Sequence, residues 1–527
     1  MISKKIKLIA LAVLSISVLS FTSEKVKVYN PERGEGKYIL TPSIPDTPQI
    51  HGASVFGVRP GSPFLYTIPA TGKGTLEYVA QNLPEGLTVN AQTGVISGNI
   101  ISKEKREYII MLIAKNNLGS DEKKLKIKVG DEICLTPPLG WNSWNCWGHN
   151  VTQERVLASA KAMVNKGLKD YGWSYINIDD VWQGVRGGKF NGIQSNPETF
   201  PDMKRMCDEI HNMGLKAGIY STPWITSYAG YAGSTSNNKK GKWDKSLADN
   251  GNENWIVGRY KFEENDAKQW AAWGIDYLKY DWYTNDYEST ERMSDALINS
   301  GRDIVFSTSN TCPVHLAEKI GKIANVIRTG GDLKDRWDQG GAHLNIREEW
   351  VLHKAWLEAG FDGAPGHYPD PDMLVVGHQS WGTKGVELKP SKLTADEQYS
   401  HISLWSLWSA PLLIGCPIEM MDEFTVKLLT NHEVLALQQD ELCRPAQSAM
   451  CTPNFEIFVK ELADGSKAVG IFNLKDEEAV LTLDWRIAGL TGAKSIRDVW
   501  RQKDIGTYEN EFKALVPSHG VVLVKIK

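Results

Sequence analysis

The chain has 527 residues, a net charge of −4 and a composition with 42% hydrophobic and 23% charged residues. This length predicts several domains, and the small negative charge argues against binding to nucleic acid or to an anionic membrane surface. The 19 Trp, beside 18 Tyr and 13 Phe, are unusual. Packing accounts for most Trp in a large domain, but indole faces also suit a ligand with apolar faces and polar edges, such as a sugar.

Residues 1–23 have the pattern of a secretory signal. Three lysines precede the mostly apolar run 8–19, and Ser17, Ser20 and Ser23 offer cleavage positions. The run is too short to span a membrane, and no Cys precedes Cys134, so no lipid anchor is expected. We therefore expect an exported protein, periplasmic or extracellular, without a membrane span. The sequence does not indicate the oligomeric state.

Residues 24–46 are polar and contain Pro, which predicts a linker. From 47 to 131, short alternating segments separated by turn signals predict a small β-sandwich. Its runs LPEGLTV (83–89) and TGVISG (93–98) resemble the bacterial immunoglobulin-like modules attached to secreted glycosidases. The module holds no cluster of titratable groups, so we interpret it as a spacer or accessory module, with carbohydrate binding as the alternative.

From 132 to 440, strand patterns alternate with helix patterns, which predicts a (β/α)8 barrel of the TIM type. Strand patterns return from 441 to 527, with a hairpin turn at Asp464-Gly465, and predict a carboxyl-terminal antiparallel β-sandwich. The fold class is therefore multidomain. The barrel strands are expected at 139–141, 174–178, 216–220, 277–281, 304–309, 326–329, near 361–364 and at 411–415.

The segment Tyr-Leu-Lys-Tyr-Asp at 277–281 reads as a short buried strand around which the site is organised. Side chains alternate along a strand, so Lys279 and Asp281 point to the same side. An ammonium group this close favours the ionised acid, so we expect a lowered pKa at Asp281 and an anionic nucleophile. The alternative is a structural ion pair that closes the strand.

Carboxylates and Trp follow several of the predicted barrel strands, where barrel enzymes carry their chemistry. One Asp pair is weak evidence, since it also suits a helix cap. Carboxylates at four strand ends with Trp beside them are better evidence for a site that holds hydroxyls and stacks on a sugar. No nucleotide fingerprint, HExxH or zinc spacing competes, so no cofactor or metal is expected. The strand-end residues are Trp141, Trp144, Asp179, Asp180, Trp182, Lys279, Asp281, Asn310, Arg328, Asp332, Asp370, Asp372 and Met373.

Hydrolysis of a glycosidic bond needs two carboxyl groups, one ionised and one that donates a proton. Asp281 suits the first role. Asp332, in a Gly-rich turn after strand six, suits the second, although a loop with a helix cap is the alternative. Arg328 would lower the pKa of Asp332, whereas an acid needs it raised. We therefore expect Arg328 on a substrate hydroxyl, or beside the acid once it is ionised.

Five motifs resemble the retaining α-galactosidases of glycoside hydrolase family 27, in the order of that family and over about residues 136–440. They are TPPLGWNSW (136–144), YINIDDVW (175–182), GLKAGIY (214–220), YLKYD (277–281) and DPDML (370–374). The resemblance implies a barrel with a carboxyl-terminal β-sandwich, and an exo-acting enzyme that releases α-linked galactose from oligo- or polysaccharides. It implies that Asp281 is the nucleophile, Asp332 the acid/base, Asp179 and Asp180 the ligands of the O4 and O6 hydroxyls, Trp144 a stacking platform, and Lys279, Arg328 and Asp372 ligands of hydroxyls.

The chain departs from the family pattern in three places. Many members have a disulfide between the loops after strands three and four, but Trp282 and Tyr283 follow the nucleophile here and no Cys lies at 220–236. Packing must then hold the loop. After strand five, Asn310 can still bind a 2-hydroxyl, but the surrounding loop is altered, and Pro369 replaces an Asn of the family.

These departures leave other specificities open, namely α-N-acetylgalactosaminidase or β-L-arabinopyranosidase on the same site. The Asp179–Asp180 pair argues against an arabinoside, which has no O6 hydroxyl. A catalytically inactive glycan-binding protein is a different class, and the presence of both Asp281 and Asp332 argues against it. A metal-dependent enzyme using Asp370 and Asp372 is the remaining alternative.

Overall fold

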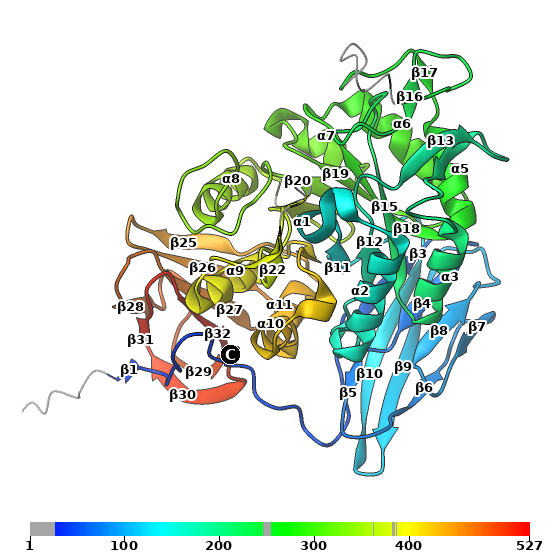
Figure 1. Ribbon diagram of the computed structural model, residues 1–527. Coiled ribbons are helices and arrows are strands. Elements are labelled where there is room, and N and C mark those ends of the chain that lie inside the picture. The colour runs from blue at the N-terminus through cyan, green and yellow to red at the C-terminus, as the bar shows by residue number, and fades with distance from the viewer. Residues whose placement is uncertain (1–26, 245, 247–254, 362, 382–384, 386) are drawn as a thin grey trace, which may run out of the picture.

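The computed structural model describes residues 27–244, 246, 255–361, 363–381, 385 and 387–527. The expected signal at 1–23 lies outside the described residues. Figure 1 shows a central barrel with an amino-terminal β module against one end and a carboxyl-terminal β domain beside it. Among the helices of the described segments, none combines the length and apolar character needed to cross a membrane.

The predicted (β/α)8 barrel is confirmed. Its eight strands pair in parallel in the order β21-β20-β19-β18-β15-β12-β11-β24. Leu374 closes the ring, because its N–H donates to the carbonyl of Leu413 (2.8 Å) and its carbonyl accepts from Gly415 (3.2 Å). The strands are β11 (Leu139–Asn142), β12 (Tyr175–Asn177), β15 (Lys216–Ser221), β18 (Ile275–Asp281), β19 (Val305–Ser309), β20 (Val326–Arg328), β21 (Tyr368–Asp370) and β24 (Leu412–Ile414).

The helices surround these strands and begin at capping residues that the sequence supplies. Thr152 and Asp286 accept from backbone N–H groups of the first turns of α2 and α6. Asn345 with Glu348, and Thr394 with Glu397, form reciprocal capping boxes at α8 and α9. The helices are α1 (Trp144–Trp147), α2 (Gln153–Asn165), α3 (Met203–Asn212), α5 (Glu263–Trp273), α6 (Tyr287–Ile298), α7 (Ala317–Gly321), α8 (Ile346–Glu358), α9 (Ala395–Leu407), α10 (Glu423–Leu429) and α11 (His432–Gln438).

The prediction of strand seven near 361–364 is wrong. The strand is β21, a few residues later, and Ala364 forms only an isolated bridge with His367. Phe361 packs its ring on Trp356 at the end of α8, with centroids 5.8 Å apart. The true strand contains Pro369, which has no N–H for the ladder, so its sequence does not look like that of a central strand.

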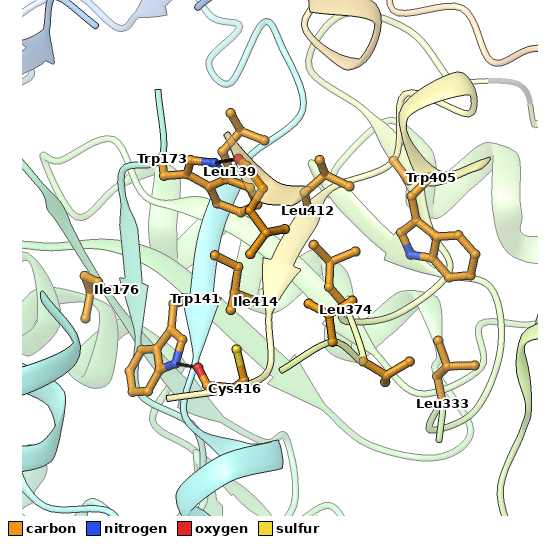
Figure 2. Packing of buried hydrophobic residues seen from close by; sticks show 14 of the residues in the cluster. Leu139, Trp141, Trp173, Ile176, Leu333, Leu374, Trp405, Leu412, Ile414 and Cys416 are labelled. Atoms are coloured by element: carbon orange, nitrogen blue, oxygen red, sulfur yellow. Dashed lines mark hydrogen bonds between the residues drawn. The ribbon is translucent and has the colours of Figure 1, made fainter. Parts of the chain in front are cut away.

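Indole side chains fill much of the interior. Of the 19 Trp, all within the described segments, 14 are buried, so packing accounts for most of them, as expected. Figure 2 shows Trp141 of β11 with its indole N–H directed at the carbonyl of Cys416 (2.9 Å). Inside the barrel, a Cβ on Gly218 would lie 1.9 Å from Oδ1 of Asn177, so a side chain at this position would displace the Asn177 amide.

The amino-terminal module is a sandwich of a four-stranded and a three-stranded sheet. It covers the amino-terminal ends of the barrel strands (Figure 1): Thr67 donates to the carbonyl of Gly214 (2.7 Å), and Asp303 accepts from Ser62 Oγ and Arg59 N (both 2.9 Å). The junction encloses about 140 Å³ at the end of the barrel opposite the strand-end carboxylates. The sheets are β3 (Val55–Val58), β10 (Gly119–Val129), β9 (Arg106–Asn116) and β6 (Glu77–Gln81), and β4 (Phe64–Thr67), β8 (Val95–Gly98) and β7 (Leu87–Val89), with a β2 (Gln49–Ile50)–β5 (Ala70–Thr71) ribbon.

The carboxyl-terminal domain is the antiparallel β-sandwich that the sequence predicts. One sheet has the order β25-β26-β27-β32-β29-β30 and the other has the order β1-β31-β28. Its strands are β25 (Gln447–Cys451), β26 (Phe455–Glu461), β27 (Lys467–Asn473), β28 (Ala479–Asp484), β29 (Ala493–Asp498), β30 (Lys503–Glu509), β31 (Glu511–Val516) and β32 (Val521–Ile526).

The segment expected to be a linker forms specific contacts from residue 27 onward. Strand β1 (Val28–Tyr29) pairs in parallel with β31 of the carboxyl-terminal domain. Further on, Leu40 N donates to the hydroxyl of Tyr399 (3.0 Å), and Thr41 Oγ1 donates to the carbonyl of Lys427 (2.8 Å). We call residues 27–46 the amino-terminal strap, since they tie the last domain to the outer helices of the barrel.

Candidate active site

Asp281 is the last residue of β18, and its carboxylate is buried. Its Oδ2 accepts a hydrogen bond from the Tyr220 hydroxyl (3.1 Å), and its Oδ1 accepts one from the Asn310 amide. Tyr220 belongs to β15 and Asn310 follows β19, so three adjacent strands converge on this carboxylate. Both donors stabilise the ionised form.

The pKa of Asp281 differs from the expectation. Burial raises it to about 6, although Lys279 acts to lower it, and the nearby Asp179 and Asp332 add to the rise. The Lys279 ammonium lies 2.8 Å from Oδ2 of Asp179. The sequence could place Lys279 on the right side of the strand, but it could not show that desolvation outweighs the attraction.

Asp179 and Asp180 follow β12 and have different partners. Asp179 accepts from the backbone N–H of Asp180 (2.9 Å) and from Lys279. Asp180 Oδ1 accepts from Ser227 Oγ (2.9 Å), and its Oδ2 accepts from the N–H of Ala229 (3.0 Å). Asp180 therefore anchors both sides of the turn that carries residue 228.

Arg328, at the end of β20, binds two carboxylates. Its Nη2 lies 2.6 Å from Oδ2 of Asp372 and 3.2 Å from Oδ1 of Asp332. Partial desolvation of its half-exposed side chain acts to raise the pKa of Asp332, but Arg328 and then Lys279 hold it below its ordinary value. Oδ1 of Asp372 is buried and has no hydrogen-bond partner among the described residues, so it retains lone pairs for a ligand hydroxyl.

The remaining predicted residues lie at the same end of the barrel. Trp144 begins α1 and is half-buried, and its backbone N–H donates to Asn142 Oδ1 (2.9 Å). Asp370 is in β21; its Oδ1 accepts from the N–H of Asp372 (2.9 Å), and burial raises its pKa to about 6. Lys279, Arg328, Asp370 and Asp372 line a common space of about 10 Å³.

Three contributing residues were missed by the sequence reasoning. Tyr220 stands in the quoted motif at 214–220, and its place at the end of a barrel strand was a usable signal. Tyr228 accepts from the Asn310 amide (3.2 Å), and nothing in the sequence pairs its loop with that residue. Glu349 is fully buried on α8 and accepts from Thr329 (2.9 Å), although it reads as an ordinary acid in the first turn of a helix.

The loop after β15 is held by non-covalent contacts, as expected. A ribbon forms between β16 (Thr235–Ser236) and β17 (Tyr260–Lys261), and the N–H of Gly258 donates to Thr235 Oγ1 (2.7 Å). All seven Cys, from Cys134 to Cys451, are free thiols.

A closed (β/α)8 barrel with buried carboxylates, cations and indoles gathered at its strand ends defines a glycosidase of the barrel class. The family model described as "Alpha galactosidase A" matches residues 136–254 and 248–440. The model of the "Alpha galactosidase C-terminal beta sandwich domain" matches 452–526, and an Ig domain model matches 47–130. The chain belongs to the α-galactosidases of glycoside hydrolase family 27.

Two named relatives and one solved structure are similar to this chain over most of its length. The α-galactosidase of Cyamopsis tetragonoloba is 34% identical over 432 residues, which is 80% of this chain and 90% of that protein. α-Galactosidase 2 of Arabidopsis thaliana is 32% identical over 75% of this chain and 90% of its own length. A candidate α-galactosidase/melibiase structure from Bacteroides fragilis covers 91% of this chain and 98% of that chain, with 32% identity and a TM-score of 0.78.

Proposed function

We propose that this enzyme releases terminal α-linked galactose from oligo- or polysaccharides with retention of anomeric configuration. The observation that carries the proposal is the setting of Asp281, a buried strand-end carboxylate with a hydrogen-bond donor on each oxygen. Such a carboxylate is fixed in orientation for attack on an anomeric carbon. The activities named for the relatives support α-galactosides as the substrate class.

In the first step, Asp281 attacks C1 of the galactosyl group, and Asp332 gives its proton to the glycosidic oxygen as that bond breaks. The galactose is then esterified to Asp281, and the leaving sugar departs as an alcohol. In the second step, the Asp332 carboxylate takes a proton from water, whose oxygen attacks C1 and frees Asp281. Retention follows from the two inversions.

The galactose itself binds at the strand ends, in our proposal. Asp179 and Asp180 accept from the O4 and O6 hydroxyls, and Trp144 stacks on the ring. Lys279, Arg328 and Asp372 bind hydroxyls. Asp180 can accept a further hydrogen bond only beside those that already hold residues 227–229.

The protonation order in the free protein is the reverse of what the reaction needs. Burial raises the pKa of Asp281 to about 6, whereas Arg328 keeps that of Asp332 low. We propose that a bound sugar excludes water from Asp332 and competes for the Arg328 guanidinium, which raises the pKa of Asp332 when the proton is required.

Proton NMR of the first-formed product tests the stereochemistry. With p-nitrophenyl α-galactoside, α-galactose should appear first and then mutarotate, and β-galactose appearing first would contradict retention. Asp281→Ala should abolish turnover, and azide should restore release with inversion. Asp332→Ala should slow substrates with poor leaving groups most; equal losses on good and poor leaving groups would remove the acid assignment.

We propose galactoside rather than N-acetylgalactosaminide specificity. Asn310 stands where the family contacts the 2-substituent of the sugar. Its amide donates to the Tyr228 hydroxyl and to Asp281, so its surroundings are closely packed. The matched p-nitrophenyl substrates compare the two sugars, and equal kcat/KM values for both would defeat this assignment while leaving the mechanism intact.

We further propose that the protein is exported, with residues 1–23 as its signal. Residues 47–131 then form a spacer or accessory module, 132–440 the catalytic barrel and 441–527 the last domain. Mass spectrometry of the mature amino terminus in the native host tests the export proposal, and an intact Met1 would contradict it.

A further inference from the structure

Three aromatic side chains stand out by their exposure. Among the Phe, Tyr and Trp of the described segments, only Tyr228, Trp255 and Tyr283 are exposed, at 39%, 56% and 65%. Exposing so much aromatic surface forfeits hydrophobic stabilisation, and a group of such side chains marks a binding surface. We call these three residues the aromatic rim.

The aromatic rim lies beside the candidate catalytic carboxylates. The rings of Tyr228 and Trp255 have centroids 5.9 Å apart, and both pack on Trp224, at 4.9 Å and 6.4 Å. Tyr283 follows Asp281 by two residues.

Tyr228 is held rigidly, as a binding platform should be. The residues on either side of it, Ser227 and Ala229, both donate to the Asp180 carboxylate. Its hydroxyl accepts from the Asn310 amide (3.2 Å), which also donates to Asp281. A platform fixed in advance loses little conformational freedom when a ligand stacks on it.

The position of the aromatic rim indicates which part of the substrate it contacts. The terminal galactose occupies the buried groups at the strand ends, whereas Asp332, whose side chain is 51% exposed, meets the glycosidic oxygen at the outer edge of the site. The rest of the substrate continues outward from that oxygen. The Tyr228 hydroxyl accepts from the Asn310 amide (3.2 Å), which also donates to Asp281, and these contacts place the rim beside the carboxylates.

We propose that the aromatic rim binds the leaving-group sugar, the residue that follows the galactose in the chain. This inference rests on the proposed function and deepens it. The C–H face of a pyranose stacks on Trp255 or Tyr283, while its hydroxyls remain in water. The enzyme is thereby adapted to galactose that is attached to another sugar, rather than to galactosides with small leaving groups.

The test compares the full-length enzyme on methyl α-galactoside, whose leaving group is too small to reach the rim, with an α-galactosyl disaccharide and a trisaccharide. Released galactose is measured with a galactose dehydrogenase assay. Trp255→Ala should lower the ratio of kcat/KM for disaccharide over methyl galactoside by roughly five- to tenfold, the value of one stacking contact. The loss should lie mainly in KM.

Two further variants separate stacking from other effects. Ile256→Ala removes an exposed apolar side chain from the same loop without removing a ring, and should keep the wild-type ratio. Tyr228→Phe keeps the ring but loses the hydroxyl that binds Asn310, so it should reduce all substrates together and leave the ratio unchanged.

The outcomes are distinct. If wild-type enzyme releases galactose but Trp255→Ala keeps the wild-type ratio, the rim does not bind the leaving sugar. The same conclusion follows if Ile256→Ala lowers the ratio as much as Trp255→Ala does. If wild-type enzyme releases no galactose from any of the three substrates, the proposed function itself fails, and the role of the rim fails with it.

Discussion

At the scale of single residues, opposing effects act on the Asp281 carboxylate. Burial disfavours its charge and raises its pKa to about 6, while Lys279 favours the charge and Tyr220 and Asn310 each donate a hydrogen bond to it. A carboxylate whose pKa lies nearer neutrality is more basic, and therefore a stronger nucleophile once ionised. Lys279, followed by Arg328, opposes the effect of burial and favours the ionised form of Asp281.

This balance predicts the acidic limb of the pH profile. In the proposed mechanism only ionised Asp281 attacks, so kcat/KM should fall as the pH drops through about 6, the value to which burial raises the pKa of Asp281. Asn310→Ala removes a donor to the anion, which raises the pKa of Asp281 further, so the limb should move to higher pH. The measurement is kcat/KM between pH 4 and 8, with Thr311→Ala as the neighbouring control. A limb that stays in place or moves downward in Asn310→Ala would contradict this account.

Residue-scale features differ in how far the sequence reveals them. Asp179, Lys279 and Arg328 were predictable, because alternation along a strand and the position of strand ends both follow from local pattern. The sign of the Asp281 pKa shift was not, because it depends on how completely other segments exclude water. The contact from Tyr228 to Asn310 joins residues 82 positions apart, and no local pattern encodes it.

At the scale of elements, the turn that carries Asp332 rests on helix α8. Glu349 of that helix is buried beneath Thr329 and Gly330, where a Cβ on Gly330 would lie 1.9 Å from Oε2 of Glu349. Burial raises the pKa of Glu349 to about 8, so the carboxyl keeps its proton at neutral pH. The turn is therefore supported by a neutral acid rather than by an ion pair.

This support predicts a pH-dependent stability. The folded-state pKa of Glu349 lies above its unfolded value of 4.5, so its contribution to stability is complete below pH 4.5 and is lost as the pH rises through about 8. Glu349→Gln keeps the shape and the Thr329 contact but cannot ionise. The Tm of the variant, relative to wild type, should rise between pH 5 and pH 8.

The matched control is Glu358→Gln, which changes an exposed carboxylate of the same helix. Differential scanning calorimetry across that pH range measures both variants. Parallel Tm curves for wild type and Glu349→Gln would show that Glu349 does not stay protonated in the folded protein.

The elements themselves were largely predictable. Seven of the eight barrel strands coincide with the strands expected from the sequence, and helices such as α8 and α9 begin at recognisable capping boxes. Strand β21 was misplaced because its Pro369 lacks a ladder donor and its pairing is imposed by β20. Tertiary pairing outweighed local propensity there.

At the scale of the whole molecule, the amino-terminal module and the candidate site occupy opposite ends of the barrel. The module contacts Gly214 and Asp303, which precede β15 and β19, whereas Asp281 is the last residue of β18. The module covers the strand beginnings through contacts such as those of Asp303 with Ser62 and Arg59. Barrel enzymes place stability at that end and chemistry at the other.

A truncated chain that begins at Glu132 should therefore keep its kcat on p-nitrophenyl α-galactoside and lose stability. The truncation removes both the module and the strap, whose Thr41 and Leu40 bond to the outer helices. Activity and Tm are measured on the same folded preparation. A large fall in kcat in a truncated protein with native circular dichroism would show that the module contributes to the site.

The strap also sets an order of assembly. Val28 and Tyr29 pair with Lys513 and Ala514, so the first described strand completes a sheet whose other members come from the end of the chain. A polypeptide synthesised amino terminus first exposes β1 long before β31 exists, and β1 must wait unpaired until then. The long separation along the chain delays this pairing but costs little stability, because the entropy of closing a loop grows only slowly with its length. Docking of β1 in this sheet therefore follows the synthesis of β31.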